Sequence, residues 1–310
     1  MRGLTQKAVG FILAMLACQA VALAQDAGPR PVLWEQVNIA SRDLYNGPGG
    51  TARKPDVRRI KFIRKETGGN NLKYRIEDAR GRVWVAKIAD ESQPETVAVR
   101  LLWGIGYKTE IAYLVPELAI PGQKTYQNVR LEARPPNVER EGRWNWQENP
   151  FVGTPQLQGL KIMMALINNW DLKDDNTVIL ATGGENQYVI SDLGASFGKL
   201  SFSSWPILTR FGRSVNKPNH FARSSFLKGV TNEGELDLAY DGKQAGLMNG
   251  ITVEDAKWLS GLLRQLSDKQ ISDAFRAANY SPAEVKLLTR AVKDRIAQLS
   301  AVSNQYEARR

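Results

Sequence analysis

The sequence predicts an α+β chain with a small antiparallel β-sheet in its first half and a mainly helical second half after about residue 150. Three short strand-like runs follow one another between residues 59 and 88, with glycine-containing turns between them, as in an antiparallel meander. Helix-capping patterns and apolar stripes at helical spacing fill the C-terminal part instead. Together these two patterns predict two lobes, the first built on strands and the second on helices.

Five strands are expected in the first lobe, at residues 59–65, 72–77, 82–88, 109–114 and 125–133. One helix interrupts them, from Ser92 to about Gly104. Ser92 can cap this helix, Pro94 fits its first turn, and Glu95 can close a capping box. The Arg134–Asn137 segment, with two consecutive prolines, breaks the strand pattern and is the expected hinge between the lobes.

The second lobe is expected to begin with a loop that packs Trp144 and Trp146 over the junction between the lobes. A helix follows from about Gln156 to Ile167, because its apolar residues recur at helical spacing. Residues 199–250 are rich in Gly, Ser, Asn and Pro and predict irregular structure with short helices. Three capped helices then end the chain, led by Thr252 (reaching Leu266), by Ser267 with Gln270, and by Ser281–Glu284 (reaching about Leu299).

The strongest functional signal is a polar loop, Asp171–Asn176, that holds three aspartates, a lysine and an asparagine. An apolar run, Tyr188–Ile190, follows and is stopped by the acid and the glycine of Asp192–Gly194. This order of helix, acidic loop, strand and acid–glycine can place Asp171, Asn176 and Asp192 around one point. Two carboxylates and an amide suit a hard divalent cation and the phosphates that it bridges.

The spacing Asp171-x-Lys173-x-x-Asn176, followed by Asp192-Leu193-Gly194, resembles the catalytic loop and the metal-binding motif of the protein kinase-like superfamily. The likeness covers roughly residues 60 to 200 and is to divergent, bacterial-type members with an atypical kinase fold. It implies a two-lobed kinase-like fold and phosphoryl transfer from ATP as co-substrate. It also implies that Asp171 orients the acceptor hydroxyl and that Lys173 neutralises the transferred phosphoryl. Asn176 and Asp192 would hold Mg²⁺ or Mn²⁺.

Val83–Lys87 resembles the strand that carries the phosphate-binding lysine of the same superfamily, so Lys87 is expected to hold the α- and β-phosphates. A helix glutamate pairs with that lysine in kinases, and Glu95 is the candidate, with the capping box as its alternative explanation. The turn at Gly68 and Gly69 is the candidate for covering the phosphates with backbone N–H groups. The full Gly-x-Gly-x-x-Gly is absent, and an ordinary hairpin turn is the alternative there.

Two departures from the family pattern concern regulation and charge. Trp170 stands where many regulated kinases carry an arginine, so control by phosphorylation of an activation segment is not expected. No Ala-Pro-Glu closes such a segment either. Asp174 and Asp175 add negative charge beside the site, where they either bind a second cation or face water.

Three alternatives to a phosphotransferase remain to be weighed. Gly194–Gly198 matches the Gly-x-Ser-x-Gly elbow of serine hydrolases, but no acid lies between Ser196 and His220, the only histidine. His220 alone also cannot build a zinc site. A kinase-like binding or scaffold protein without catalysis, a pseudokinase, is the main alternative, because ATP is scarce outside the cytoplasm. Nucleotidyl transfer is also open, and the sequence does not say whether the acceptor is a protein, a lipid or a small molecule.

Residues 1–24 are typical of a secretory signal peptide, with Arg2 and Lys7 before an apolar stretch and a small-x-small cleavage site at Ala22–Ala24. We therefore expect a periplasmic or secreted protein that begins near Gln25, with no transmembrane segment in the mature chain. Cys18, the only cysteine, lies inside the apolar stretch, and the leucine two residues before it makes a poor lipidation context.

The expected boundaries are a signal peptide at 1–24, a leader packing on the surface at 25–57, the first lobe at 58–136 and the second at 137–310. The full chain carries a net charge of +10. This charge favours anionic partners such as nucleotides, phospholipid or acidic polymers, or it serves solubility alone. No specific nucleic-acid-binding motif accompanies it.

Overall fold

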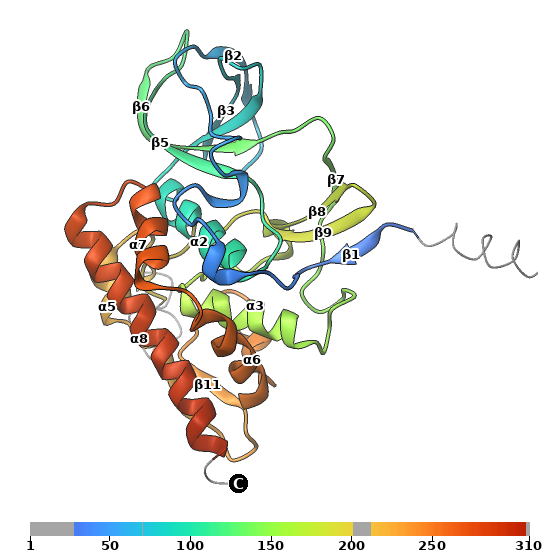
Figure 1. The fold of residues 1–310 in the computed structure, drawn as a ribbon, viewed down its shortest axis with the longest axis vertical. Coiled ribbons are helices and arrows are strands. Elements are labelled where there is room, and N and C mark those ends of the chain that lie inside the picture. The colour runs from blue at the N-terminus through green and yellow to red at the C-terminus, as the bar shows by residue number, and fades with distance from the viewer. Residues whose placement is uncertain (1–27, 70, 201–211, 308–310) are drawn as a thin grey trace, which may run out of the picture.

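The computed structural model describes residues 28–69, 71–200 and 212–307, which form two lobes (Figure 1). The predicted signal peptide, with Cys18 and the cleavage site, lies outside the described residues. None of the helices in the described ranges has the length and apolarity needed to cross a bilayer.

The upper lobe in Figure 1 is a five-stranded antiparallel sheet with strand order β2-β3-β4-β6-β5. Its strands are β2 (Lys61–Glu66), β3 (Leu72–Glu77), β4 (Val83–Ile88), β5 (Ala112–Ala119) and β6 (Thr125–Ala133). All five expected strands are present. The expected strand at 109–114 starts later and runs past Pro116, which is tolerated because β5 lies at the edge of the sheet. Trp84 and Ala86 of β4 face the core of this lobe, so Lys87 points to the opposite side.

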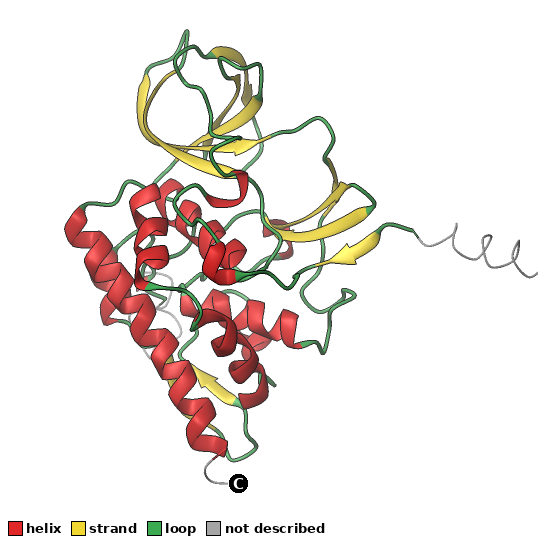
Figure 2. Cartoon of the chain, viewed as in Figure 1, coloured by secondary structure: helices red, strands yellow, loops and turns green. Residues whose placement is uncertain are grey.

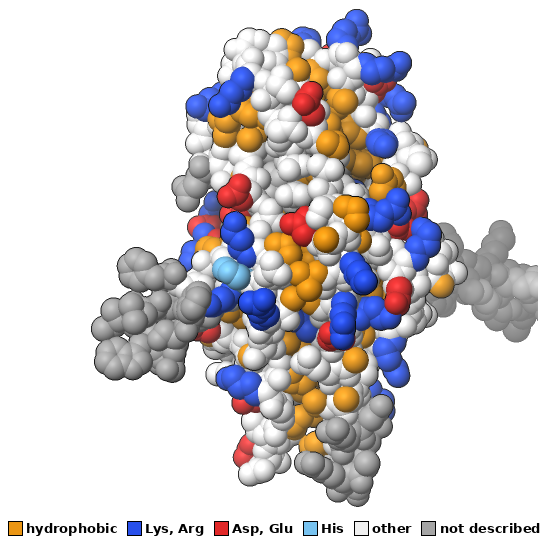
Figure 3. All heavy atoms as spheres, turned by 90° about the vertical axis from the view of Figure 1, so that its left-hand side faces the viewer, with side chains coloured by type: hydrophobic (Ala, Val, Ile, Leu, Met, Phe, Trp, Pro, Cys, Tyr) orange, Lys and Arg blue, Asp and Glu red, His pale blue; other side chains and the backbone are white. Residues whose placement is uncertain are grey.

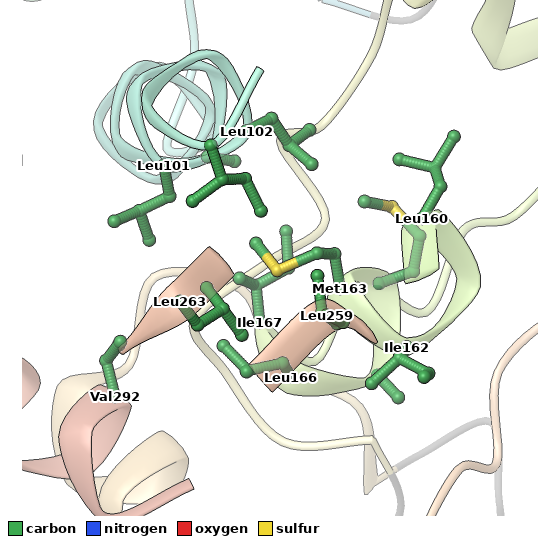
Figure 4. Close-up of a cluster of buried hydrophobic side chains, with 14 of the residues drawn as sticks. Leu101, Leu102, Leu160, Ile162, Met163, Leu166, Ile167, Leu259, Leu263 and Val292 are labelled. Atoms are coloured by element: carbon green, nitrogen blue, oxygen red, sulfur yellow. The ribbon is translucent and has the colours of Figure 1, made fainter. Parts of the chain in front are cut away.

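Helix α2 (Ser92–Gly104) connects the two lobes. It contacts β5 and β6 of the sheet, yet its apolar side chains join the core of the helical lobe. In Figure 4, Leu101 and Leu102 lie opposite Met163 and Leu263, which come from the helical lobe. A helix expected to belong to the first lobe is therefore anchored in the second one.

The lower lobe holds most of the helices (Figure 2), and Lys and Arg side chains are spread over both lobes on the face drawn in Figure 3. They are α3 (Pro155–Leu166), α5 (Pro218–Arg223), α6 (Val253–Leu263), α7 (Asp268–Ala277) and α8 (Pro282–Glu307). The predicted caps are confirmed, since Thr252 and Ser267 each form a capping box with the residue three positions later. Helix α6 ends before Leu266, and α8 continues well beyond Leu299. Trp144 and Trp146, expected over the junction, are buried in the large core.

The structure has a second sheet that the sequence analysis did not predict. Its strand order is β1-β9-β8-β7. Its strands are β1 (Arg30–Val32), β7 (Glu139–Gly142), β8 (Thr177–Thr182) and β9 (Glu185–Ile190). A short hairpin of β10 (Leu227–Val230) and β11 (Leu236–Leu238) completes the strands. The short 3₁₀ helices are η1 (Ile39–Ser41), η2 (Gly47–Gly49), η3 (Asp174–Asn176) and η4 (Ala245–Met248).

The leader segment does not pack on the surface as expected. β1 pairs in parallel with β9, and Leu33, Ile39 and Leu44 are at most 2% exposed. Leu44 packs against Gly104 at the end of α2, where an added Cβ would come within 3.1 Å of its Cδ1. The prediction is wrong here because these apolar side chains are buried in the large core, in contact with α2 and the helical lobe.

Arg295 of α8 holds the end of α3 in place. Its Nη1 donates to the carbonyl of Leu166 at 2.7 Å and to Oδ1 of Asn168 at 2.8 Å. Its Nη2 donates to the carbonyl of Phe221 at 3.2 Å. Burial lowers the pKa of this guanidinium to about 9, and several carbonyl oxygens share its charge. This buried arginine fixes the segment that leads into the acidic loop.

Candidate active site

Lys87 is a buried cation on β4, with 4% of its surface exposed. Its Nζ lies 2.9 Å from Oε2 of Glu95, 3.0 Å from Oε2 of Glu91 and 3.2 Å from Oδ1 of Asp192. Burial alone would lower the pKa of Lys87, but these three carboxylates raise it well above its usual value. The lysine therefore stays charged and joins β4, α2 and the loop after β9.

Glu95 does not close a capping box. Glu91 takes the N-cap position without a side-chain cap, and Ser92 lies inside the helix, where its hydroxyl donates to the carbonyl of Lys87 at 3.0 Å. Glu95 is 1% exposed and uses its carboxylate for Lys87 instead. The capping explanation of Glu95 is therefore wrong, and the helix glutamate and strand lysine are paired.

A second buried cation, Arg130 of β6, lies behind this pair. Its Nη1 lies 3.5 Å from Oε1 of Glu95 and 2.6 Å from Oε2 of Glu132. Its Nη2 lies 3.9 Å from Oε2 of Glu110, which in turn contacts Arg140 of β7. Buried charges are therefore linked continuously from Lys87 to the segment that joins the lobes.

Asp171 lies in the loop after α3 and is partly buried. Its Oδ2 is 3.0 Å from Nζ of Lys173, and its Oδ1 is 2.5 Å from Nζ of Lys243. Nδ2 of Asn176 donates to the Asp171 carbonyl at 2.7 Å and to its Oδ2 at 3.2 Å. Burial would raise the pKa of Asp171, but the hydrogen bonds from Lys243, Lys173 and Asn176 lower it below its usual value. Asp171 is therefore an ionised acceptor held in one orientation.

Asn176 also connects this loop to Asp192. The backbone N–H groups of Ser191 and Asp192 donate to the Asn176 carbonyl at 2.8 and 3.4 Å. Oδ1 of Asp192 accepts from the N–H of Gly194 at 3.2 Å and from Lys87. The structure thus brings together the acidic loop, the acid–glycine motif and the strand lysine, which are far apart in the sequence.

The turn with Gly68 and Gly69 joins β2 to β3 beside the same lysine. In the sheet register Lys73 lies opposite Lys87, so the turn lies at the end of the sheet where Lys87 is located. Gly69 has a φ of 76°, which glycine adopts at little cost. Nδ2 of Asn71 donates to Oε2 of Glu91 at 2.6 Å, which ties the turn to α2.

Asn176 and Asp192, the residues expected to hold a metal, are neighbours through a backbone hydrogen bond. The Asp192 side chain is 37% exposed, and Asn176 turns its amide nitrogen to Asp171, which leaves the amide oxygen as the donor for a cation. Within the described ranges, no group of three His, Cys, Asp or Glu side chains forms a preformed metal cage. One carboxylate and one amide oxygen fit Mg²⁺ or Mn²⁺ when substrate phosphates supply further ligands.

Comparison with known proteins identifies the fold. No family model and no curated protein sequence matches the chain. Among solved structures, the chain is similar to the proinflammatory kinase CtkA of Helicobacter pylori, with 10% identity over 81% of this chain and 97% of that chain and a TM-score of 0.50. The chain has a protein kinase-like fold. The bacterial neighbour fits the predicted divergent, bacterial-type likeness, and at this identity the likeness concerns the fold alone.

A second similarity is to the MAP kinase LmaMPK10 of Leishmania major, with 12% identity over 80% of this chain and 94% of that chain. Its TM-score is 0.22, so we draw nothing from it. The predicted α+β architecture, with an antiparallel sheet lobe before a helical lobe, is confirmed for the kinase-like fold.

The serine-hydrolase alternative finds no support in this kinase-like fold. Ser196 is fully buried, and its Oγ donates to the carbonyl of Leu193 at 2.7 Å. An added Cβ on Gly198 would lie 1.8 Å from the backbone oxygen of Ser214, so the glycine is needed for close packing of two loops. His220 contacts Ser214 at 3.0 Å rather than Ser196. Ser196 is therefore a structural residue.

Sequence reasoning missed three charged residues of the site: Glu91, Arg130 and Lys243. Lys243 reaches Asp171 because its backbone N–H donates to the carbonyl of Trp170 at 2.8 Å. Its Nζ also lies 5.7 Å from the centroid of the Trp170 ring. Glu91 could have been found, because it precedes Lys87's partner Glu95 by one helical turn on the same face. Arg130 and Lys243 carry no local signal.

The two additional acids of the loop have structural partners. Asp174 accepts a hydrogen bond from Nδ2 of Asn145 at 2.8 Å and one from the N–H of Trp146 at 3.2 Å. Asp175 is largely exposed and contacts Arg143. Both acids therefore fasten the acidic loop to the segment that enters α3.

Proposed function

We propose that the protein is a phosphotransferase that takes ATP, together with Mg²⁺ or Mn²⁺, and phosphorylates a protein, lipid or small-molecule hydroxyl. The observation that carries this proposal is Asn176. It contacts Asp171 through its side chain and Asp192 through its backbone, while Asp192 contacts Lys87. Groups suited to an acceptor hydroxyl, a cation and a phosphate thereby lie within one site, and phosphoryl transfer needs little beyond such positioning.

Each residue of this chain has a distinct task in the proposal. Lys87 holds the α- and β-phosphates, and Glu95 keeps the lysine in place. Asp171 orients the acceptor hydroxyl and accepts its proton, and Lys173 neutralises charge on the transferred group. Asn176 and Asp192 would hold the metal, which supplies charge neutralisation on the phosphates when bound. The backbone of Gly68 and Gly69 would cover the phosphates.

The test is calorimetry with ATP and each metal on the wild type, Asp192→Asn and Asp171→Asn. Asp192→Asn should abolish metal-dependent nucleotide binding without unfolding the protein, because it removes the one carboxylate proposed to bind the metal. Asp171→Asn should still bind nucleotide, while transfer falls roughly 10²–10⁴-fold, the usual contribution of a positioned general base. Wild-type protein that binds nucleotide without turnover would indicate a pseudokinase. Wild-type protein that binds no nucleotide with any divalent cation would indicate a scaffold.

We also propose that the protein is exported to the periplasm or the cell exterior. The support is the charged start, the apolar stretch and the cleavage site of residues 1–24. The intact mass of the protein from its native host should correspond to a chain that begins at or near Gln25. A mass that includes residues 1–24 would exclude cleavage there.

A further inference from the structure

One residue of the site has a contact that the proposed chemistry does not use. Glu91, at the start of α2, places Oε2 3.0 Å from Nζ of Lys87, and the same oxygen accepts from Nδ2 of Asn71 at 2.6 Å. The Glu91 side chain also lies against Gly194, where an added Cβ would come within 2.5 Å of the Glu91 Cβ. A single carboxylate therefore joins the β2–β3 turn, the strand lysine and the loop after Asp192.

The hydrogen-bonding capacity of Lys87 makes this contact consequential. An ammonium group has three N–H donors, and three carboxylates surround Lys87. A phosphate can reach the lysine only if one of these carboxylates gives up its place. The choice among Glu91, Glu95 and Asp192 follows from their surroundings.

Glu95 is the least able to leave. Its side chain is 2% exposed and contacts Arg130 as well as Lys87, so moving it would leave buried charges unpaired. The Asp192 side chain is 37% exposed, but the N–H of Gly194 holds it in addition to Lys87, and the proposed function gives it the metal as a new partner. The Glu91 side chain is 27% exposed, and its ion-pair and hydrogen-bond partners within the described residues are Lys87 and Asn71. Glu91 has no task in the proposed chemistry and, in the described part of the chain, no cationic partner besides Lys87, so it is the carboxylate that can exchange its contacts for water when a phosphate binds.

We propose that Glu91 regulates this same nucleotide site as a latch that the phosphates must displace. This inference rests on the proposed function. In the latched state, Glu91 occupies the phosphate side of Lys87 and holds the Gly68–Gly69 turn through Asn71. Displacement by a nucleotide polyphosphate frees the lysine and the turn together. The latch therefore lowers the affinity for ATP by the fraction of molecules in which it is closed.

The experiment is isothermal titration calorimetry of Mg²⁺–ATP and of adenosine with the wild type and Glu91→Gln. The glutamine keeps the size of the side chain and can still accept from Asn71, but it loses the charge that holds Lys87. We expect Glu91→Gln to bind Mg²⁺–ATP about threefold to tenfold more tightly, in line with the loss of a partly exposed ion pair. Adenosine, which carries no phosphate, should bind both proteins equally.

Asp90→Asn is the matched control. Asp90 is the exposed neighbour of Glu91, so the variant makes the same change in net charge without touching Lys87. Equal tightening in Asp90→Asn and Glu91→Gln would overturn the latch, since general electrostatics would then explain both. Wild-type binding of Mg²⁺–ATP with unchanged or weaker binding by Glu91→Gln would overturn the latch and leave the proposed function standing. Absence of Mg²⁺–ATP binding by both proteins would overturn the two together.

Discussion

The two charged halves of the site differ in how they are built. The Lys87 half consists of buried side chains, with Lys87, Glu95 and Arg130 all at most 4% exposed. The Asp171 half faces the solvent, because the side chains of Lys173 and Lys243 are 38% and 42% exposed. Buried ion pairs are costly to disrupt by removing one partner, whereas exposed ones contribute little to stability. We therefore expect the ion pairs of the first half to contribute more to stability than those of the second.

The buried half also extends further through the protein. From Asp192 it passes through Lys87, Glu95 and Arg130 to Glu132 and Glu110. It ends at Arg134, in the segment expected to be the hinge, and at Arg140 of β7. The charges that hold Lys87 are thus shared with the connection between the lobes. Among the described residues, the ion pairs of Asp171 are those with Lys173 and Lys243, so the exposed half is a short cluster.

Arg130→Met should have the largest effect on stability. The methionine fills much of the volume but leaves Glu95, Glu132 and Glu110 without their shared cation, so we expect a loss of about 3–5 kcal/mol. Lys243→Met is the matched control, since it also removes a cation from a carboxylate, and it should cost less than about 1 kcal/mol. Thermal unfolding of both variants measures the difference. Similar losses would show that burial does not distinguish the two halves.

The same contrast explains how far the sequence could predict the site. Asp171, Lys173 and Asn176 lie within one loop, and local spacing was enough to group them. Lys87 and Glu95 lie on consecutive elements, so their pairing could also be expected. Spacing could not decide between the pair and a capping box, because both are compatible with a glutamate in the first turn. The structure decides it through the burial of Glu95.

The remainder of the site depends on contacts between distant segments. Lys243 approaches Asp171 because Tyr240 donates to the Asn169 carbonyl at 2.8 Å, a contact that no local pattern encodes. Arg130 lies in register with Lys87, on the face of β6 opposite the core residues Val129 and Leu131, so its position in the sequence fits a solvent-facing strand residue. Only the three carboxylates around it make its burial tolerable. The burial of the leader could not be predicted from a local pattern either, because its apolar residues are too widely spaced to indicate a packed element.

In the fold as a whole, elements with strong local signals were predicted well. The strand Leu72–Glu77 and the helix Ser92–Gly104 have the expected bounds. Thr252 and Ser267 cap the expected helices, because a capping box is a contact between residues three positions apart. The sheet order β1-β9-β8-β7 could not be predicted, because this sheet pairs β1 of the leader with β9, a strand far along the chain that lies between Asn176 and Asp192.

Glu110 offers a smaller and pH-dependent test of the buried half. Burial, followed by the neighbouring Glu132 carboxylate, raises the pKa of Glu110 to about 7, although Arg140, Arg134 and Arg130 oppose this. Burial would also raise the pKa of Glu132, but Arg134 and Arg130 lower it well below its usual value. Glu110 therefore keeps its proton in the folded protein at pH values where it is ionised in the unfolded chain.

The direction of the pH effect follows from this difference. Between the unfolded value of 4.5 and the folded value of about 7, the folded state binds a proton that the unfolded state has released. The contribution of Glu110 to stability therefore falls as the pH rises through this window, by on the order of 3 kcal/mol at 1.36 kcal/mol per pKa unit. Glu110→Gln mimics the protonated acid and should lose this dependence. Melting temperatures of both proteins from pH 5 to 8 measure the effect, and the melting temperature of the variant should rise relative to that of the wild type toward pH 8.

Glu139→Gln, at an exposed position on β7, is the control, and its melting temperature should change with pH as that of the wild type does. A constant gap between Glu110→Gln and the wild type across this range would mean that Glu110 is ionised when folded, and that the arginines of the buried half hold two full negative charges there.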